Sequence, residues 1–169
     1  GFQEVDFSAM FGPLCKWAAR IDSAERIPEY VARAYATAMS GRPGPVVLAL
    51  PEDMLLDQVV AMDRPRVTAP EQDPDAAAMA VLMDMIKNAA SPIAIVGGAG
   101  WDAGAAEYFA EFATRIGLPV AAAFRRQDAI ANDCPVYAGN LGYGPNPKLL
   151  ARIREADLII AVGARLGEA

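Results

Sequence analysis

The sequence contains no histidine and only two cysteines, and these absences exclude several kinds of active site. Without histidine, the chain can build neither a Ser-His catalytic triad nor a histidine-ligated metal centre from its own residues. Cys15 and Cys134 lie far apart in the sequence, which favours two free thiols in a reducing compartment over a disulfide framework. We therefore expect a cytoplasmic protein with no metal site in this segment.

Long apolar runs and clustered positive charge are also missing. No apolar stretch reaches the roughly 18 residues that a membrane-spanning helix needs, and no basic segment followed by an apolar one begins the chain. The net charge is −6, and the basic residues form no stripe. We expect neither a membrane nor a nucleic acid as partner. The remaining composition, with 54% hydrophobic and 21% charged residues, is typical of a globular protein.

The most distinctive stretch runs from Ser40 to Asp53 and reads Ser-Gly-Arg-Pro-Gly-Pro-Val-Val-Leu-Ala-Leu-Pro-Glu-Asp. Apolar residues at helical spacing before it predict a helix that begins near Ile27 and is closed by Gly41. Residues 46–50 are apolar without alternation, which predicts a parallel strand buried on both faces. Residues 1–22 show no clear period, so we expect short helical turns and loops there.

The composition of the chain changes near residue 56 and again near residue 73. Residues 56–72 are rich in proline and charge, which predicts a linker between a first domain, residues 1–55, and a second, residues 73–169. In the second domain we predict, in order, a helix starting at Pro74 with Asp73 as its cap, a strand 93–96, a helix 103–116, a strand 119–124, a loop 125–146, a helix 147–155 and a strand 158–162. This order predicts an α/β fold: a Rossmann-like domain with a parallel sheet in three αβα layers, preceded by part of a second α/β domain.

Residues 98–103 read Gly-Ala-Gly-Trp-Asp-Ala, which fits G-x-G-x-x-A between a predicted strand and a predicted helix. Such glycines let backbone N–H groups approach a pyrophosphate at a helix N-terminus. They suit any tight strand-to-helix turn equally well, so both interpretations stay open. The next predicted strand leads into Arg125-Arg126-Gln127 and not into the acidic residue that binds the ribose of NAD, which disfavours NAD.

Four arginines are candidates for binding an anion. Arg165 follows the predicted strand 158–162, at the edge where open α/β sheets bind ligands, and Arg42 lies in the stiff turn before residue 46. For both, pairing with a neighbouring carboxylate is an equally open interpretation. Arg125 and Arg126 could likewise contact an anion or be solvated loop charges.

Together these stretches resemble the thiamine diphosphate-dependent enzymes of the acetolactate synthase type. The matching segments are residues 2–4, 40–53, 96–98, 117–120 and 162–168. The resemblance implies that the chain comprises the end of a pyrimidine-binding domain and most of a central domain. It implies activity on a small-molecule 2-oxo acid, by decarboxylation, carboligation or both, in the full-length enzyme. Thiamine diphosphate and Mg²⁺ would be held mostly by residues outside this segment, so we expect the 169 residues alone to be inactive.

The resemblance also implies roles for single residues. Gln3 and Lys16 would line the approach of the substrate to the cofactor, and are the candidate catalytic residues. Four residues would contact FAD, as in the flavin-containing members: Arg42, Gly97, Gly98 and Arg165. The sequence departs from acetolactate synthases at Glu52, where they usually carry a lysine that guides an anionic substrate, and at residues 125–127, which replace a small apolar loop near the flavin.

Several alternatives follow from these departures. The nucleotide site could hold FAD, an ADP-containing ligand or nothing. The chain could instead be a stand-alone nucleotide-binding or electron-transfer module, or its second domain could act only as an assembly scaffold. Because an incomplete sheet leaves an apolar edge exposed, we also expect this segment to self-associate, at least to a dimer. As the expected assembly we take a homodimer or homotetramer.

Overall fold

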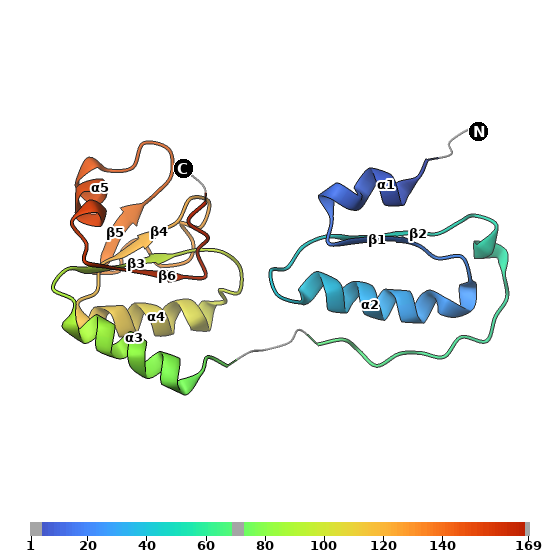
Figure 1. The fold of residues 1–169 in the computed structure, drawn as a ribbon, viewed down its shortest axis with the longest axis horizontal. Helices are drawn as coiled ribbons and strands as arrows, with labels where there is room; N and C mark the ends of the chain where they lie inside the picture. Colours follow the sequence, from blue (N-terminus) through green and yellow to red (C-terminus); the bar gives the residue numbers. More distant parts are fainter. Residues whose placement is uncertain (1–4, 69–72, 168–169) are drawn as a thin grey trace. The chain divides into compact units, whose positions relative to one another are not determined.

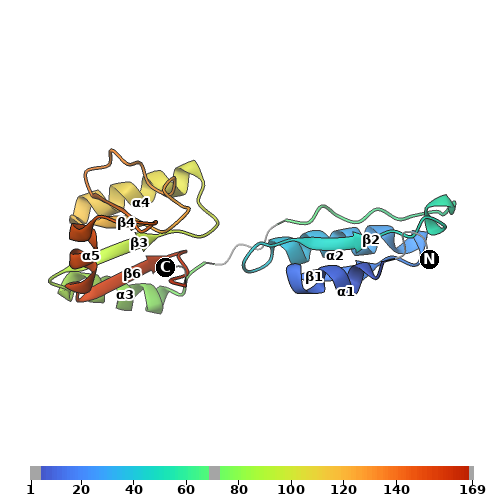
Figure 2. The same ribbon diagram turned by 90° about the horizontal axis from the view of Figure 1, so that it is seen from above.

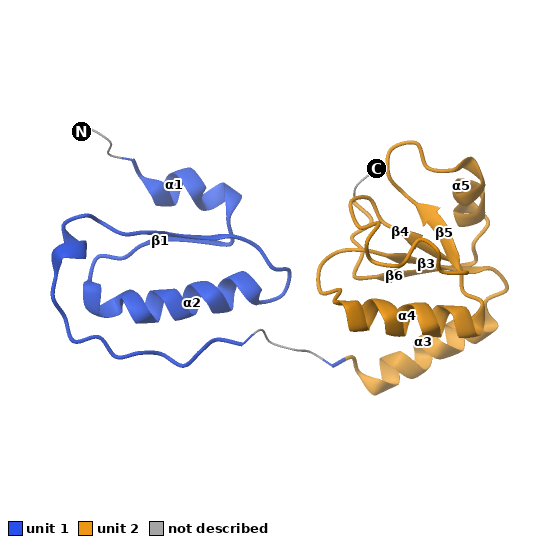
Figure 3. Ribbon diagram, turned by 180° about the vertical axis from the view of Figure 1, so that it is seen from behind, with its two compact units in different colours: residues 1–73 blue, residues 74–169 orange. Residues whose placement is uncertain are grey.

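The computed structural model describes residues 5–68 and 73–167, and the chain divides into two compact units, residues 1–73 and 74–169 (Figure 3). Each unit has its own parallel sheet. Residues 57–68 form no helix or strand. The predicted α/β class with parallel sheets is confirmed, whereas the division into domains and a linker stays a prediction.

In unit 1, two strands pair in parallel, β1 (Trp17–Arg20) and β2 (Val46–Ala49). Helix α2 (Ile27–Met39) lies between them in the sequence. A short helix α1 (Phe7–Phe11) lies on the opposite face of the sheet from α2 (Figure 1). Three 3-10 turns complete the described part: η1 (Gly12–Leu14), η2 (Ala24–Arg26) and η3 (Met54–Leu56). Its small core is built around Ile21, Ala24 and Met54.

The predictions for unit 1 are partly wrong. Helix α2 begins at Ile27 as predicted, and Gly41 follows its C-cap with a positive φ of 54°. Strand β1 was not predicted, because four residues of mixed polarity become a strand only by pairing with β2. Strand β2 is half-buried at every position, and not buried on both faces, because β1 is its only neighbour among the described residues.

The described part of unit 2 contains a four-stranded parallel sheet in the order β5-β4-β3-β6. Its strands are β3 (Pro92–Val96), β4 (Val120–Ala122), β5 (Tyr137–Asn140) and β6 (Leu158–Val162). Its helices are α3 (Ala76–Asn88), α4 (Ala103–Ile116) and α5 (Pro147–Arg154). Figure 2 shows α4 on one side of this sheet and α3 on the other.

Alternation along β3 divides the core of unit 2 into two halves. Ala94 and Val96 belong to a cluster that includes Phe109 and Phe112 of α4. Ile93 and Ile95 belong to a second cluster with Leu149 of α5. Since successive side chains of a strand point to opposite faces, α4 and α5 cover opposite faces of the sheet. This arrangement gives the three predicted layers.

Most element boundaries in unit 2 match the sequence-based expectation, and the differences have local causes. Asp75, not Asp73, caps α3, because its carboxylate accepts a hydrogen bond of 2.9 Å from the N–H of Ala78. Strand β5 lies inside the predicted loop 125–146. Its sequence Tyr-Ala-Gly-Asn has weak strand propensity, and Gly139 has a φ of 121°, so only its pairing with β4 makes it a strand.

Candidate functional site

The carboxyl ends of β3, β4 and β6 meet at one edge of the sheet, because the strands are parallel. From β3 the chain proceeds to β4 and β5 on one side and then returns to β6 on the other. The order of strands therefore reverses between β3 and β6. Open α/β sheets bind ligands at such switch points, outside the carboxyl ends of the strands. This edge carries Gly97, Gly98 and Arg165, three of the predicted site residues.

Two glycine turns touch through their backbones at the switch point. Gly98 has a φ of 74°, and a Cβ added to it would lie 1.9 Å from the carbonyl oxygen of Gly163. Gly163 has a φ of 64°, and its Cβ would lie 2.6 Å from the carbonyl oxygen of Gly97. A Cβ on Gly97 would approach that of Ala123 to 2.7 Å. The glycines are therefore required by the close contact of two strand ends, in addition to any role toward a ligand.

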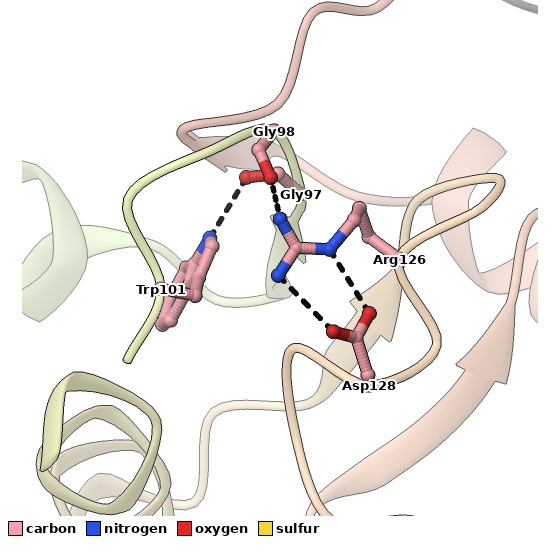
Figure 4. Close-up of polar contacts among 5 residues, drawn as sticks. All are labelled: Gly97, Gly98, Trp101, Arg126 and Asp128. Atoms are coloured by element: carbon pink, nitrogen blue, oxygen red, sulfur yellow. Dashed lines mark hydrogen bonds and ion pairs between the residues drawn. The ribbon is translucent and has the colours of Figure 1, made fainter. Parts of the chain in front are cut away.

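Side chains fasten both carbonyls of this turn (Figure 4). The indole Nε1 of Trp101 donates to the carbonyl oxygen of Gly97 at 2.8 Å, and the guanidinium of Arg126 donates to that of Gly98. Arg126 also forms an ion pair with Asp128, with Nε 2.9 Å from Oδ1. The hydrogen bond from Arg126 lowers the pKa of the Asp128 carboxyl. The loop after β4 is thus tied to the turn after β3.

Arg126 is the functional candidate that the sequence failed to single out. From the sequence alone, Arg125 and Arg126 were equally open to interpretation as anion ligands or as solvated charges. The structure separates the two residues: the Arg126 side chain is only 25% exposed, whereas Arg125 is exposed, with its guanidinium 5.0 Å from the centre of the Phe124 ring. Asp128, two positions after Arg126, is the one sequence signal that could have indicated an anchored arginine, but such spacing is common in loops.

An apolar groove of about 490 Å³ adjoins the glycine turn. Its aromatic walls come from Trp101 and from Tyr108, Phe109 and Phe112 of α4, and its other side from Val162 and Gly163. Trp101 packs edge-on against Phe109, with ring centroids 5.7 Å apart. Aromatic walls beside a few polar groups are typical of sites for flat ring systems. This groove could not be predicted from the sequence, because its lining residues come from two separate segments.

The N-terminus of α4 is already capped by a side chain. Asp102 accepts a hydrogen bond of 2.7 Å from the N–H of Ala105. A carboxylate therefore lies where the G-x-G-x-x-A pattern would bring a phosphate to the helix. An anion at this edge would have to be held mainly by the turn and by cationic side chains. Arg165, which follows β6, is exposed and available as one of these.

In unit 1 the structure brings Lys16 to the turn that carries Arg42. The Lys16 ammonium donates to the carbonyl oxygen of Ser40 at 2.5 Å. The hydroxyl oxygen of Ser40 lies 3.4 Å from the same ammonium nitrogen. A Cβ added to Gly44 would lie 3.1 Å from Cδ of Lys16, so glycine leaves room for the lysine stem. Arg42 is exposed. Gln3 lies outside the described residues.

A second hollow, of about 300 Å³, lies at the carboxyl ends of β1 and β2. It is lined by Arg20, Asp22, Pro51, Asp53, Met54 and Asp57. Arg20 and Asp22 neutralise each other through an ion pair of 2.6 Å. Among the described residues, no group of three or more histidine, cysteine, aspartate or glutamate side chains could hold a metal ion. None of the described helices is long and apolar enough to cross a membrane.

Comparison with known proteins places this geometry in a family. Residues 79–169 match the model of the central domain of thiamine pyrophosphate enzymes. Over 99% of its length the chain is 29% identical to sulfoacetaldehyde acetyltransferase of Alcaligenes xylosoxydans xylosoxydans and 31% identical to the acetolactate synthase isozyme 2 large subunit of Escherichia coli K12. These matches cover 28% and 30% of the two relatives.

A solved structure agrees with the sequence matches. Benzoylformate decarboxylase from Polynucleobacter necessarius superimposes with a TM-score of 0.76 and 30% identity, over 95% of this chain and 30% of that one. The chain thus spans a little under a third of the length of the proteins that it matches. The family match confirms the resemblance seen in the sequence: residues 79–169 match the family's central domain, and this chain belongs to the thiamine pyrophosphate enzyme family.

Proposed function

We propose that the whole protein is a thiamine diphosphate-dependent enzyme that acts on 2-oxo acids, as a lyase, a transferase or both. The match of residues 79–169 to the family's central domain carries this proposal. The similar proteins include a decarboxylase, a synthase and an acetyltransferase, which supports a reaction by decarboxylation, carboligation or both. We further propose a cytoplasmic homodimer or homotetramer.

When bound, thiamine diphosphate would accept the electron pair that is released when a 2-oxo acid loses CO₂. Lys16 and Gln3 would line the path of the substrate to this cofactor. The Lys16 ammonium has three N–H donors and directs two contacts to Ser40, so a donor and a positive charge remain for a substrate carboxylate. Mg²⁺ and the diphosphate of the cofactor would be held by residues outside this chain.

The switch point of unit 2 has the properties of a nucleotide site. Two backbone turns in close contact, an aromatic groove and the exposed Arg165 fit a ligand with a flat ring and a diphosphate. Gly97, Gly98 and Arg165 would hold the diphosphate there, and a contact of Arg42 with the cofactor stays a prediction from the family resemblance. FAD is the first candidate, with a mainly structural role, and an ADP-containing ligand is the second.

The test is an assay of the intact protein, encoded by the reading frame that contains this chain, with a panel of 2-oxo acids that includes pyruvate and benzoylformate. We expect CO₂ release or carboligation that requires both thiamine diphosphate and Mg²⁺. Turnover that is unaffected by removing thiamine diphosphate would contradict the proposal. Binding of FAD or ADP without any thiamine-dependent turnover would indicate a nucleotide-binding or electron-transfer module instead, and binding of neither would indicate a scaffold.

A further inference from the structure

Arg126 retains unused hydrogen-bonding capacity beside the glycine turn. A guanidinium has five N–H donors. In Arg126, Nε and Nη2 point to the carboxylate of Asp128 and Nη1 donates to the carbonyl oxygen of Gly98 (Figure 4). These contacts use three donors, so one N–H on each terminal nitrogen remains. Arg126 is thus a cation fixed at the switch point with two donors left for another acceptor.

A ligand anion can replace the Asp128 carboxylate that now pairs with Arg126. The Asp128 side chain is 73% exposed, so its attraction to the guanidinium is screened by water. A diphosphate carries more negative charge than one carboxylate and offers oxygens that match the planar fork of arginine. Arg125 next to it is less suited to such a role, because it is exposed and its guanidinium lies over the Phe124 ring.

We propose that Arg126 is a phosphate-binding residue of the nucleotide site at the Gly97-Gly98 turn. The inference rests on the proposed function only in requiring that a diphosphate ligand occupies this site. Its contact with Gly98 already places the guanidinium on the turn where the diphosphate would lie. A ligand would take the donors that Arg126 has free, and could displace the exposed Asp128 carboxylate as well. The alternative is that Arg126 only ties two loops together.

Calorimetric titration of the intact protein with ADP and with adenosine separates these roles. A charge-assisted contact with phosphate contributes about 1.5–3 kcal/mol, so Arg126→Ala should weaken ADP binding roughly ten- to a hundredfold. Adenosine, which lacks phosphate, should bind the wild type and the variant alike. Arg126→Lys, which keeps the charge and loses the fork, should show an intermediate loss. The matched control is Arg125→Ala, for which we expect less than a threefold change.

Each outcome has a distinct meaning. Equal ADP affinity in the wild type and Arg126→Ala, with only a lower melting temperature in the variant, would overturn this inference and leave the nucleotide site intact. Failure of the wild-type protein to bind ADP or adenosine would overturn the nucleotide site and the inference together. If Arg126→Ala does not fold, Arg126→Lys decides: unchanged ADP affinity in that variant overturns the role of the fork.

Discussion

Two apolar strands in this chain, β2 and β3, end up in very different surroundings. Four of the five residues of β3 are buried, whereas all four residues of β2 are only half-buried. Strand β3 has β4 and β6 as neighbours and a helix on each face, while among the described residues β2 pairs only with β1. Apolar character therefore makes burial favourable, but the number of neighbouring elements decides how much of it is achieved.

The same contrast separates the turns of the two units. In unit 2, glycines at the ends of β3 and β6 approach each other so closely that a Cβ has no room. In unit 1, Gly41 has a positive φ, but nothing lies within 4 Å of the place where its Cβ would be. Gly98 and Gly163 are required by packing between segments, whereas Gly41 is required by backbone conformation alone.

The largest effect is expected from an added methyl group at these glycines. Gly98→Ala should destabilise unit 2 by about 3 kcal/mol or more, because the methyl would meet the Gly163 carbonyl in addition to the strain of a positive φ. Gly41→Ala should cost only about 1–2 kcal/mol, from the backbone strain. Urea unfolding followed by circular dichroism measures both. Equal losses in the two variants would contradict the contrast between the turns.

A matched pair of valines tests the contrast between the strands. Val96→Ala removes two methyl groups from a fully buried position and should cost about 2–3 kcal/mol. Val47→Ala, at a half-buried position of β2, should cost about 1 kcal/mol or less. Hydrogen exchange resolved by peptide assigns each loss to its unit. A larger loss for Val47→Ala would show that β2 is more completely buried in solution than in this structure.

A smaller, pH-dependent effect is expected at the opposite edge of the second sheet. The Asp157 carboxylate accepts hydrogen bonds from the N–H groups of Ala90 and Ser91, at 2.7 and 2.9 Å, and these bonds lower its pKa. A folded-state pKa below the unfolded value stabilises the protein above the unfolded pKa of about 3.9, and this contribution is lost as the pH falls through the folded pKa.

Asp157→Asn should therefore lower the melting temperature of unit 2 at pH 7, by less than Val96→Ala does. The difference from wild type should shrink as the pH is lowered below about 4. Asp133→Asn, at an exposed loop position of the same unit, is the control and should have little effect. A difference between Asp157→Asn and wild type that stays constant from pH 7 to pH 3 would exclude the carboxylate as its source.

The smallest effect is expected at Lys16 in unit 1. Lys16→Met keeps the stem that packs at Gly44 but removes the exposed hydrogen bond to Ser40, so the loss of stability should stay below about 1 kcal/mol. If Lys16 lines the substrate path, the same variant should lower kcat/KM of the intact enzyme far more than its stability. Loss of activity in proportion to loss of folded protein would assign Lys16 a structural role.

The sequence by itself determined the elements whose signals are local. Gly117 marks the end of α4, and Asn146 followed by proline marks the start of α5, because caps depend on neighbouring residues only. The apolar runs of β3 and β6 predicted their positions in the same way. The motifs at residues 40–53 and 162–168 were distinctive enough to identify the family, which the comparisons confirm.

Only the tertiary structure decided which distant residues meet. Strands β1 and β5 exist because a neighbouring strand completes their hydrogen bonds, and their own sequences do not require it. The contact of Gly98 with Gly163 joins residues from two strand ends, and that of Arg126 with Gly98 joins two loops. Spacing along the chain cannot reveal such contacts, because they depend on the order of strands in the sheet. The switch point between β3 and β6 is set by that order alone.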